Sequence, residues 1–141
     1  MKETGILNRD LAELLSAQGH QDQMMICDAG FAIPEEIRVV DLSLKKNDPL
    51  IDQVLEEIAR HYSIEKIVMA EETKNVSPSK FEKVRDILGR ELQVETVEHT
   101  KLKEMSHKIK FAIRTGDFTA YSNVLLISGP GDRWYVECPD S

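Results

Sequence analysis

The sequence predicts a single α/β domain, a three-layer sandwich in which a mixed, largely parallel sheet carries helices on both faces. Short apolar runs bounded by turn residues, such as residues 24–27, 66–70 and 111–114, are typical of buried strands. Longer segments with apolar residues at helical spacing, such as residues 51–62, lie between these runs. Alternation of strands with helices is the pattern of a parallel sheet covered by helices.

The first third of the chain predicts one helix followed by two strands. A helix is expected over residues 8–18, because Asn8 is a suitable N-cap, three leucines follow at helical spacing, and Gly19 is a natural stop. The apolar run of residues 24–27 is too short for a helix and is predicted to be a buried strand. Residues 38–42 are predicted to form the next strand.

The middle of the chain predicts two helices on either side of a strand. Residues 47–49, Asn-Asp-Pro, open the first of these helices, with the proline near its first turn. Its apolar stripe consists of Ile51, Val54, Leu55, Ile58 and Tyr62. The strand over residues 66–70 ends in a polar segment, residues 71–75, and Ser77-Pro78 opens the next helix.

The last third predicts three strands and a short helix. Residues 92–97 alternate between apolar and polar and are expected to form a strand, and residues 100–108 a short helix. The remaining strands are expected at 111–114 and 124–127, joined through Thr115-Gly116-Asp117. We expect a domain over 1–129.

The bulk properties narrow the choice of partners. The chain has 141 residues, a net charge of −7 and a pI near 5.1, so nucleic acid and anionic membranes are poor partners. No apolar run approaches the roughly 20 residues of a membrane span, and residues 1–5 lack the apolar stretch expected of a secretion signal. Cys27 and Cys138 do not make a disulfide framework, so a cytoplasmic protein is expected. Residues 130–141 form a tail that contains the only tryptophan, Trp134.

Asp28 marks the first candidate site. It directly follows the predicted strand at 24–27, and ligands of open α/β sheets collect beyond the carboxyl ends of strands. His20 precedes the same strand, so one strand length separates it from Asp28. Both could reach one ligand only if a neighbouring subunit or a fold-back of the chain brought His20 round, which hints at oligomerisation. Alternatively, His20 caps the preceding helix and Asp28 is a turn residue.

Two further groups could converge on Asp28. His99 follows the strand at 92–97, which is another carboxyl-end position, and Tyr121, Ser122 and Asn123 precede the last strand. Each has a structural alternative, because His99 could be a solvated loop residue and Tyr121 and Asn123 could simply enter a strand.

Other chemistries are disfavoured by the motifs. The chain lacks the Gly-x-Gly-x-x-Gly and phosphate-loop fingerprints and the Gly-x-Ser-x-Gly elbow, which argues against nucleotide and acyl-transfer enzymes. His20, Cys27, Asp28 and His99 are possible metal ligands, but no Cys-x-x-Cys or His-x-x-x-His pair is present. Cys27 would face away from Asp28 on a strand, and a buried thiol is usually inert. No metal and no cofactor are therefore expected.

Taken together, the motifs of the chain resemble those of the D-ribose pyranase and fucose mutarotase family over residues 1–129. The shared motifs are Leu7-Asn8, Gly19-His20-x-Asp22, Asp28-Ala29-Gly30-x-x-x-Pro34, Asp41-Leu42-Ser43-Leu44, Ala70-Glu71-Glu72-Thr73-Lys74, His99 and the block Ile113-Arg114-Thr115-Gly116-Asp117-Phe118-Thr119-Ala120-Tyr121-Ser122-Asn123. Asp41-Leu42-Ser43-Leu44 and Ile113-Arg114-Thr115-Gly116 favour the ribose pyranase branch.

The resemblance implies a cofactor-free isomerase that interconverts pyranose and furanose forms, and anomers, of D-ribose. It also implies a homo-oligomer of stacked rings, commonly a decamer, with sites at subunit contacts. By position, His20 matches the proton-donating histidine of the family. Asp28, His99 and Tyr121-Ser122-Asn123 match its sugar-binding positions. The alternatives are a mutarotase for L-fucose or another sugar, and a non-catalytic sugar-binding accessory protein, with a metal-dependent lyase or isomerase third.

Two features depart from the family pattern. Family chains usually end soon after the last strand, whereas this chain continues through Gly129-Pro130-Gly131-Asp132 into its tail. Phe31-Ala32-Ile33 and Ala120 stand where the ribose branch usually has Leu/Met-Pro and Pro. We expect these changes to alter the edge of the pocket without removing a catalytic group.

Overall fold

The protein is described here by a computed structural model, which covers residues 1–138. Residues 139–141, the last part of the predicted tail, lie outside the described residues. The elements in chain order are α1 (Arg9–Ala17), β1 (Gln23–Cys27), β2 (Arg38–Asp41), α2 (Ile51–His61), β3 (Ile64–Ala70), α3 (Glu71–Val76), α4 (Pro78–Leu88), β4 (Gln93–Val97), α5 (His99–Met105), a 3-10 turn (Ser106–Lys108), β5 (Phe111–Arg114) and β6 (Val124–Ser128).

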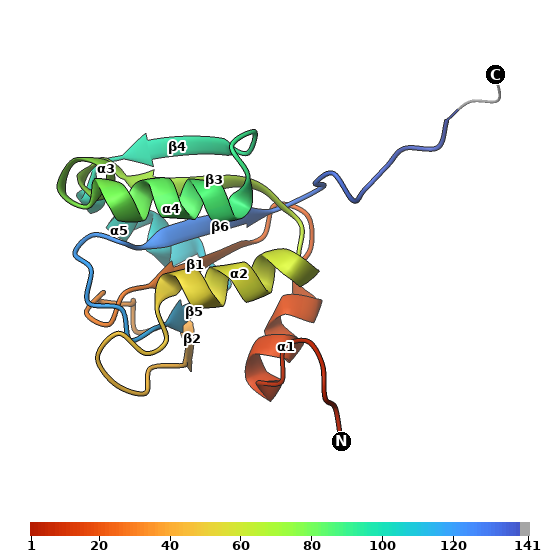
Figure 1. Cartoon of the computed structure of the whole chain (residues 1–141), viewed down its shortest axis with the longest axis horizontal. Helices are drawn as coiled ribbons and strands as arrows, with labels where there is room; N and C mark the ends of the chain where they lie inside the picture. Colours follow the sequence, from red (N-terminus) through yellow and green to blue (C-terminus); the bar gives the residue numbers. More distant parts are fainter. Residues whose placement is uncertain (139–141) are drawn as a thin grey trace.

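The six strands form one sheet in the order β2-β5-β1-β6-β3-β4. β1 and β2 both run parallel to β5, and β3 runs parallel to β4, whereas β6 is antiparallel to its neighbours β1 and β3. The sheet is therefore mixed and largely parallel, as predicted. β6 fills the centre and joins two parallel halves, so all strands except β6 end at the same edge (Figure 1).

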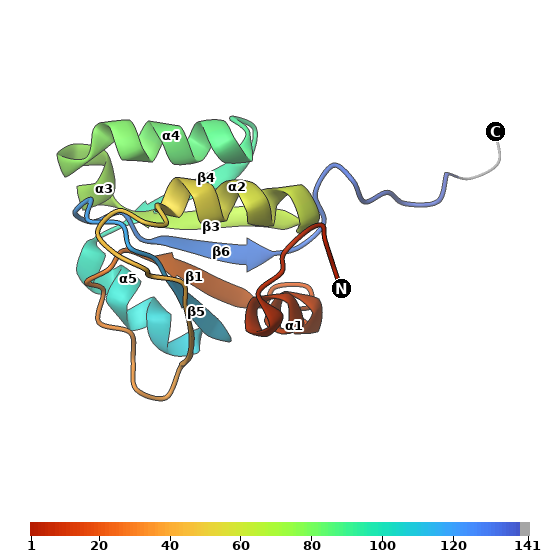
Figure 2. The same cartoon turned by 60° about the horizontal axis from the view of Figure 1, so that its bottom comes forward.

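Helices cover both faces of the sheet, which confirms the three-layer prediction. Apolar residues of α1, α2 and α4 pack with Met24 and Ile26 of β1 on one face. Leu102 of α5 packs with Met25 and Cys27 on the other face, and the two sets alternate along β1 as side chains of a strand must. Figure 2 shows α2 and α4 on one side of the sheet and α5 on the other.

Most predicted elements agree with the structure to within two residues, and the differences are local. Asn8 caps α1 by accepting a hydrogen bond from the backbone N–H of Leu11 at 2.9 Å, as expected for an N-cap. Residues 71–76, interpreted only as a polar segment, form the short helix α3. α5 begins at His99 rather than at residue 100, so His99 lies on a helix and not in a loop.

Candidate functional site

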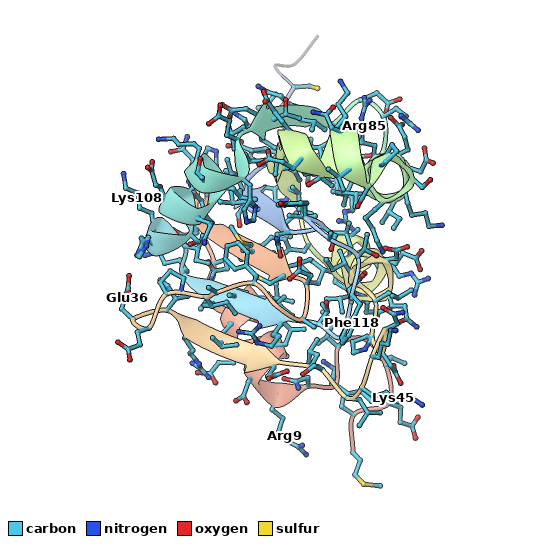
Figure 3. The ribbon with its side chains drawn as sticks, turned by 90° about the vertical axis from the view of Figure 1, so that its left-hand side faces the viewer. Arg9, Glu36, Lys45, Arg85, Lys108 and Phe118 are labelled. Atoms are coloured by element: carbon cyan, nitrogen blue, oxygen red, sulfur yellow. The ribbon has the colours of Figure 1, made fainter. Side chains whose placement is uncertain are left out.

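The carboxyl edge of the sheet collects five of the six predicted site residues. Asp28 follows β1 and His99 follows β4, and both strands end at this edge. β6 runs in the opposite direction, so residues 121–123, which precede it, lie at the same edge. Figure 3 looks onto this edge, with Phe118 labelled on the loop between β5 and β6.

Asp28 and Asn123 are joined directly. The backbone N–H of Asp28 donates to Oδ1 of Asn123 at 2.8 Å, and Asn123 is almost fully buried. The register of the sheet explains this contact, because Ile26 pairs with Val124 and so brings the two flanking residues together. Oδ1 of Asp28 also accepts from the N–H of Gly30 at 3.0 Å. The predicted turn role of Asp28 is therefore present alongside its position in the candidate site.

The surroundings of Asp28 raise the pKa of its carboxyl. Burial raises the pKa of this carboxyl, and the charge of Asp117 adds to the increase, while backbone N–H groups of Gly30, Phe31 and Ser122 act in the opposite direction. The pKa is raised on balance. A carboxyl whose pKa is raised toward neutrality is better suited to exchange a proton with a hydroxyl group.

His99 lies between two aromatic rings. Its ring meets Tyr121 edge-on with centroids 5.0 Å apart and Phe31 edge-on at 6.0 Å. Its backbone N–H donates to both carboxyl oxygens of Glu72, at 3.1 and 3.2 Å, which anchors the first turn of α5 to α3. Within residues 1–138, Nδ1 of His99 is buried and has no hydrogen-bond partner. Buried polar atoms are nearly always paired, so Nδ1 of His99 is one of the few exceptions in this part of the chain.

Ser122 and Tyr121 have different environments within the same loop. Ser122 is fully buried, and its hydroxyl donates to the carbonyl of Thr119 at 2.8 Å. Its side chain is thus engaged inside the protein, and its backbone N–H is the group that faces Asp28. Tyr121 is 38% exposed and has a φ of 55°, a left-handed conformation that non-glycine residues rarely adopt. The carbonyl of Tyr121 accepts from the hydroxyl of Thr73.

A buried ion pair holds this loop in place. The carboxylate of Asp117 is fully buried and lies 2.8 Å from Nζ of Lys80, which also lies 2.6 Å from Asp52. Asp117 further accepts from the backbone N–H of Ile51 at the start of α2, and its own carbonyl accepts from Ala29 at 2.9 Å. Asp117 thus joins the Asp28 turn, the loop before β6 and two helices.

An open depression of about 320 Å³ lies beside Asp28. Its walls come from the turn at residues 28–30 and the loop at residues 117–120. Phe118, on its rim, is 60% exposed and lies under Nζ of Lys46, which is 5.5 Å from the ring centroid. The carboxyl edge therefore offers a shallow hollow beside Asp28 that is bordered by exposed aromatic surface.

His20 lies at the opposite edge of the sheet. It precedes β1, its side chain is 60% exposed, and its Nε2 lies 3.2 Å from Oε2 of Glu65. Glu65 reaches this position across Gly129, where any side chain would overlap the Glu65 carboxyl. A second cavity, of about 420 Å³, is lined by His20, Tyr62 and Trp134 among others. Within one copy of the chain, His20 does not join the other predicted site residues.

No metal or membrane feature is found among residues 1–138. These residues contain no group of three or more His, Cys, Asp or Glu side chains that could hold a metal ion. Cys27 is fully buried, and burial raises the pKa of its thiol far above the ordinary value, so it is not a nucleophile. None of the helices in this part of the chain has the length and apolar character needed to cross a bilayer.

Comparison with known sequences establishes the family. The sequence pattern of the RbsD / FucU transport protein family matches residues 1–130. The chain belongs to this family. D-ribose pyranase of Pseudothermotoga lettingae is 40% identical over 129 residues, which are 92% of each chain. D-ribose pyranase of Streptococcus uberis is 41% identical over 129 residues, which are 92% of this chain and 98% of the relative.

Solved structures agree with this assignment. RbsD of Bacillus subtilis, solved in complex with D-ribose, matches with a TM-score of 0.88 and 34% identity, over 92% of this chain and 98% of that one. The fucose mutarotase of Streptococcus pneumoniae, solved with L-fucose, matches with a TM-score of 0.72 but only 15% identity, over 89% of this chain and 94% of that one. The second likeness shows the shared fold alone.

Sequence reasoning missed Glu65, Glu72, Lys80 and Asp117 as partners of the site. Glu65 is 45 residues from His20 in sequence, and Lys80 is 37 residues from Asp117. No local spacing links such residues, because only the fold brings them together. Glu72 and Asp117 lie in the family motifs at residues 70–74 and 113–123, and these motifs were the available signals.

Proposed function

We propose that this protein is a D-ribose pyranase, which interconverts the six- and five-membered ring forms, and the anomers, of D-ribose without a cofactor. Its relatives named D-ribose pyranase are about 40% identical over 92% of the chain. The observation that carries the proposal is the cluster of Asp28, His99, Tyr121 and Asn123 at one sheet edge. This cluster offers hydroxyl-binding groups beside the aromatic rings of Phe31 and Tyr121, as a sugar site requires.

The chemistry requires only the movement of protons. Opening a cyclic hemiacetal delivers a proton to the ring oxygen, removes one from the anomeric hydroxyl and breaks the bond between the anomeric carbon and the ring oxygen. Closing the chain through a different hydroxyl reverses these steps and yields the other ring size. No electrons and no phosphate are transferred, so acid–base side chains are sufficient.

We assign the proton-donating role to His20, because imidazole titrates closest to neutral pH among the side chains. If Nε2–H donates to Glu65, the other ring nitrogen, Nδ1, is left to exchange a proton with the sugar. Asp28, or a water that it orients, receives or steers the second proton. His99, Tyr121 and Asn123 hold the sugar hydroxyls, and the backbone N–H of Ser122 supports Asp28.

The proposal includes a homo-oligomer with sites at subunit contacts. His20 and Asp28 lie at opposite ends of β1, whose five residues span roughly 15 Å, so one copy does not present both to one sugar. A second copy that places its His20 edge against the Asp28 edge would complete the site. The exposed rings of Phe118 and Tyr121 at that edge are suited to such a contact. We propose that the copies assemble into stacked rings that form a decamer, the assembly that the resemblance to the family implies.

The cellular setting follows from the same proposal. We propose that the protein acts in the cytoplasm, in carbohydrate metabolism, on free monosaccharide. Its two cysteines support a reducing compartment, because Cys27 and Cys138 are both unpaired thiols among the described residues.

Exchange NMR on D-ribose tests the function. We expect the purified protein to accelerate pyranose–furanose exchange at catalytic concentration, with and without a chelator. L-Fucose and other pentoses, measured in the same way, separate a ribose pyranase from a mutarotase of different preference. Binding of ribose without any acceleration of exchange would show a non-catalytic accessory protein instead. A rate abolished by the chelator would contradict the metal-free mechanism.

A further inference from the structure

The segment that follows β6 is anchored to the end of α2. The guanidinium of Arg133 donates to the carbonyls of Ala59, Arg60 and Tyr62, at 3.1, 2.6 and 2.9 Å. These carbonyls belong to the last turn of α2, whose carbonyls have no partners within the helix and which carries partial negative charge. A cation at this point is favourable, so Arg133 fixes the start of the tail.

Trp134 is held by a second contact. Its indole N–H donates to the hydroxyl of Ser63 at 2.8 Å, and its backbone N–H donates to the carbonyl of Gly131 at 3.1 Å. These bonds orient the indole, although the side chain remains 68% exposed. Exposed aromatic surface that is held in one orientation is suited to meet a ligand.

Trp134 and His20 line the same cavity. The cavity has a volume of about 420 Å³, which lies in the range of small-molecule sites. Its walls consist of Gln18, Gly19, His20, His61, Tyr62, Ser63, Ser128, Gly129, Pro130 and Trp134. Residues 18–20 before β1, residues 61–63 at the end of α2 and Trp134 therefore line one space, which is large enough for a monosaccharide.

Trp134 lies outside the part of the chain that the family shares. The family pattern ends at residue 130, and the match to the Streptococcus uberis relative already covers 98% of that protein. Only about 2% of that relative lies outside the match, so it has no segment as long as this tail. In this chain the tail adds an aromatic wall to the cavity around His20.

We propose that Trp134 is a sugar-binding residue that packs against the C–H face of the ribose ring while His20 acts on it. A furanose or pyranose ring presents apolar C–H groups on one face, and an indole is the largest apolar plane a side chain can offer. This assignment rests on the proposed function, since it takes His20 as the residue that meets the sugar. It makes the tail a determinant of sugar affinity and selectivity.

Tryptophan fluorescence reports on Trp134 alone, because it is the only tryptophan in the chain. We expect D-ribose to change the tryptophan fluorescence of the wild-type protein saturably, with a midpoint equal to the KM of exchange. Glycerol at matched viscosity is the solvent control. W134A is expected to raise the KM for ribose about three- to tenfold with little change in kcat, and W134F is expected to restore most of the loss.

Tyr135 provides the matched control variant. It is 92% exposed and is not among the residues that line the cavity. Y135A should therefore leave both KM and the fluorescence response unchanged. Circular dichroism and thermal unfolding of each variant verify that the fold persists, as expected for residues outside the core.

The outcomes separate this inference from the proposed function. If the wild-type protein exchanges ribose rapidly while saturating ribose leaves the fluorescence unchanged and W134A has the wild-type KM, the role of Trp134 is wrong and the pyranase assignment stands. If ribose changes the fluorescence but the protein accelerates no exchange, Trp134 contacts sugar and the catalytic assignment fails. If ribose produces neither effect, both are overturned.

Discussion

His20 and Glu65 form a pair whose importance can be tested at the level of single atoms. The imidazole Nε2 lies 3.2 Å from the Glu65 carboxylate, and Gly129 leaves room for that carboxylate to reach it. We expect H20A to lower the rate of ribose exchange about 10²–10⁴-fold, the usual contribution of general acid–base catalysis. Exchange NMR at saturating ribose measures the loss. An undiminished rate in H20A would remove His20 from the mechanism.

Glu65 is expected to act by orienting His20. E65Q retains a hydrogen-bond acceptor but loses the charge, and we expect kcat to fall roughly five- to tenfold with KM little changed. The chain offers a matched control, because His107 and Glu36 form a similarly exposed pair at 2.8 Å that lines neither of the two cavities. E36Q should leave exchange at the wild-type rate. Equal effects of the two variants would argue that Glu65 has no special role.

The sequence predicts the location of a site residue well where that location depends only on the end of a strand. Asp28 was placed at the carboxyl end of β1 from the end of an apolar run, and the structure agrees. Partners such as Glu65 and Asp117 could not be predicted in this way, because their contacts join distant segments. A hydrogen-bonding side chain gives no local sign of which distant residue it will meet.

At the scale of elements, the loop before β6 depends on the Lys80–Asp117 ion pair between α4 and the core. Lys80 is 10% exposed and Asp117 fully buried, so removing one partner leaves a buried charge. K80M is expected to lower the free energy of unfolding by about 3 kcal/mol. It should also raise the KM for ribose, because the same loop carries Tyr121 and Asn123. Urea unfolding and exchange kinetics measure the two effects.

Lys83 serves as the control for Lys80. It lies on the same helix and is exposed, so K83M should change neither stability nor KM. K80R keeps the charge and should recover most of the affinity for ribose if the pair positions the loop. A wild-type KM in K80M, despite lost stability, would show that the pair is structural only.

The acid dependence of stability follows from Asp117. Burial alone would raise the pKa of this carboxyl, but hydrogen bonds from Lys80, Thr119 and Ile51 outweigh burial and lower the pKa on balance. The folded state therefore holds the charged form more strongly than the unfolded state, whose aspartates titrate near pH 3.9. The resulting stabilisation is fully present above about pH 4 and is lost as the pH falls further.

The variant D117N isolates this contribution. At pH 7 we expect D117N to be less stable than the wild-type protein by a few kcal/mol, since Lys80 loses a buried partner. Below pH 4 the difference should narrow, because the unfolded wild-type chain then takes up a proton at Asp117 that the folded protein binds only at lower pH. Urea unfolding at pH 7 and at pH 3 checks both statements. A difference that is independent of pH would contradict the lowered pKa.

Among the elements, strongly periodic segments were predicted well and short polar ones were not. β5 matches its predicted bounds, and α2 buries Ile51, Val54, Leu55 and Ile58 of its expected apolar stripe, whereas Tyr62 lies just beyond its last residue. α3 was missed because its six residues, Glu-Glu-Thr-Lys-Asn-Val, have no apolar periodicity, and tertiary contacts with α4 and β3 support it. The antiparallel direction of β6 was likewise beyond the reach of periodicity, which predicts a strand but not its direction.

For the molecule as a whole, topology explains why the predicted site residues lie at two edges of the sheet. A single antiparallel strand, β6, at the centre of a parallel sheet puts residues 121–123 at the same edge as Asp28. His20, three residues before the start of β1, lies at the other edge, next to the end of β6. The separation that the sequence order implied is thus a property of the fold, and we propose that a second copy brings the two residues together.

Complementation between subunits tests this division directly. H20A lacks the proton donor and D28N lacks the carboxylate, so each homo-oligomer should be nearly inactive. If one site combines His20 of one copy with Asp28 of another, then mixed oligomers formed by co-expression regain intact sites. Random mixing of equal amounts should restore about a quarter of the wild-type exchange rate, because each partner position is wild type in about half of the copies.

The double variant H20A/D28N, co-expressed with wild-type protein, calibrates the measurement. In that mixture a divided site also yields about a quarter of the wild-type rate, whereas a site formed within one copy yields about half. The H20A and D28N mixture could remain inactive even though size measurements show mixed oligomers. That result would place His20 and Asp28 in one copy's site or remove one of them from the mechanism. Recovery of activity would instead require that neighbouring copies share each site, as the opposite positions of the two residues on β1 predict.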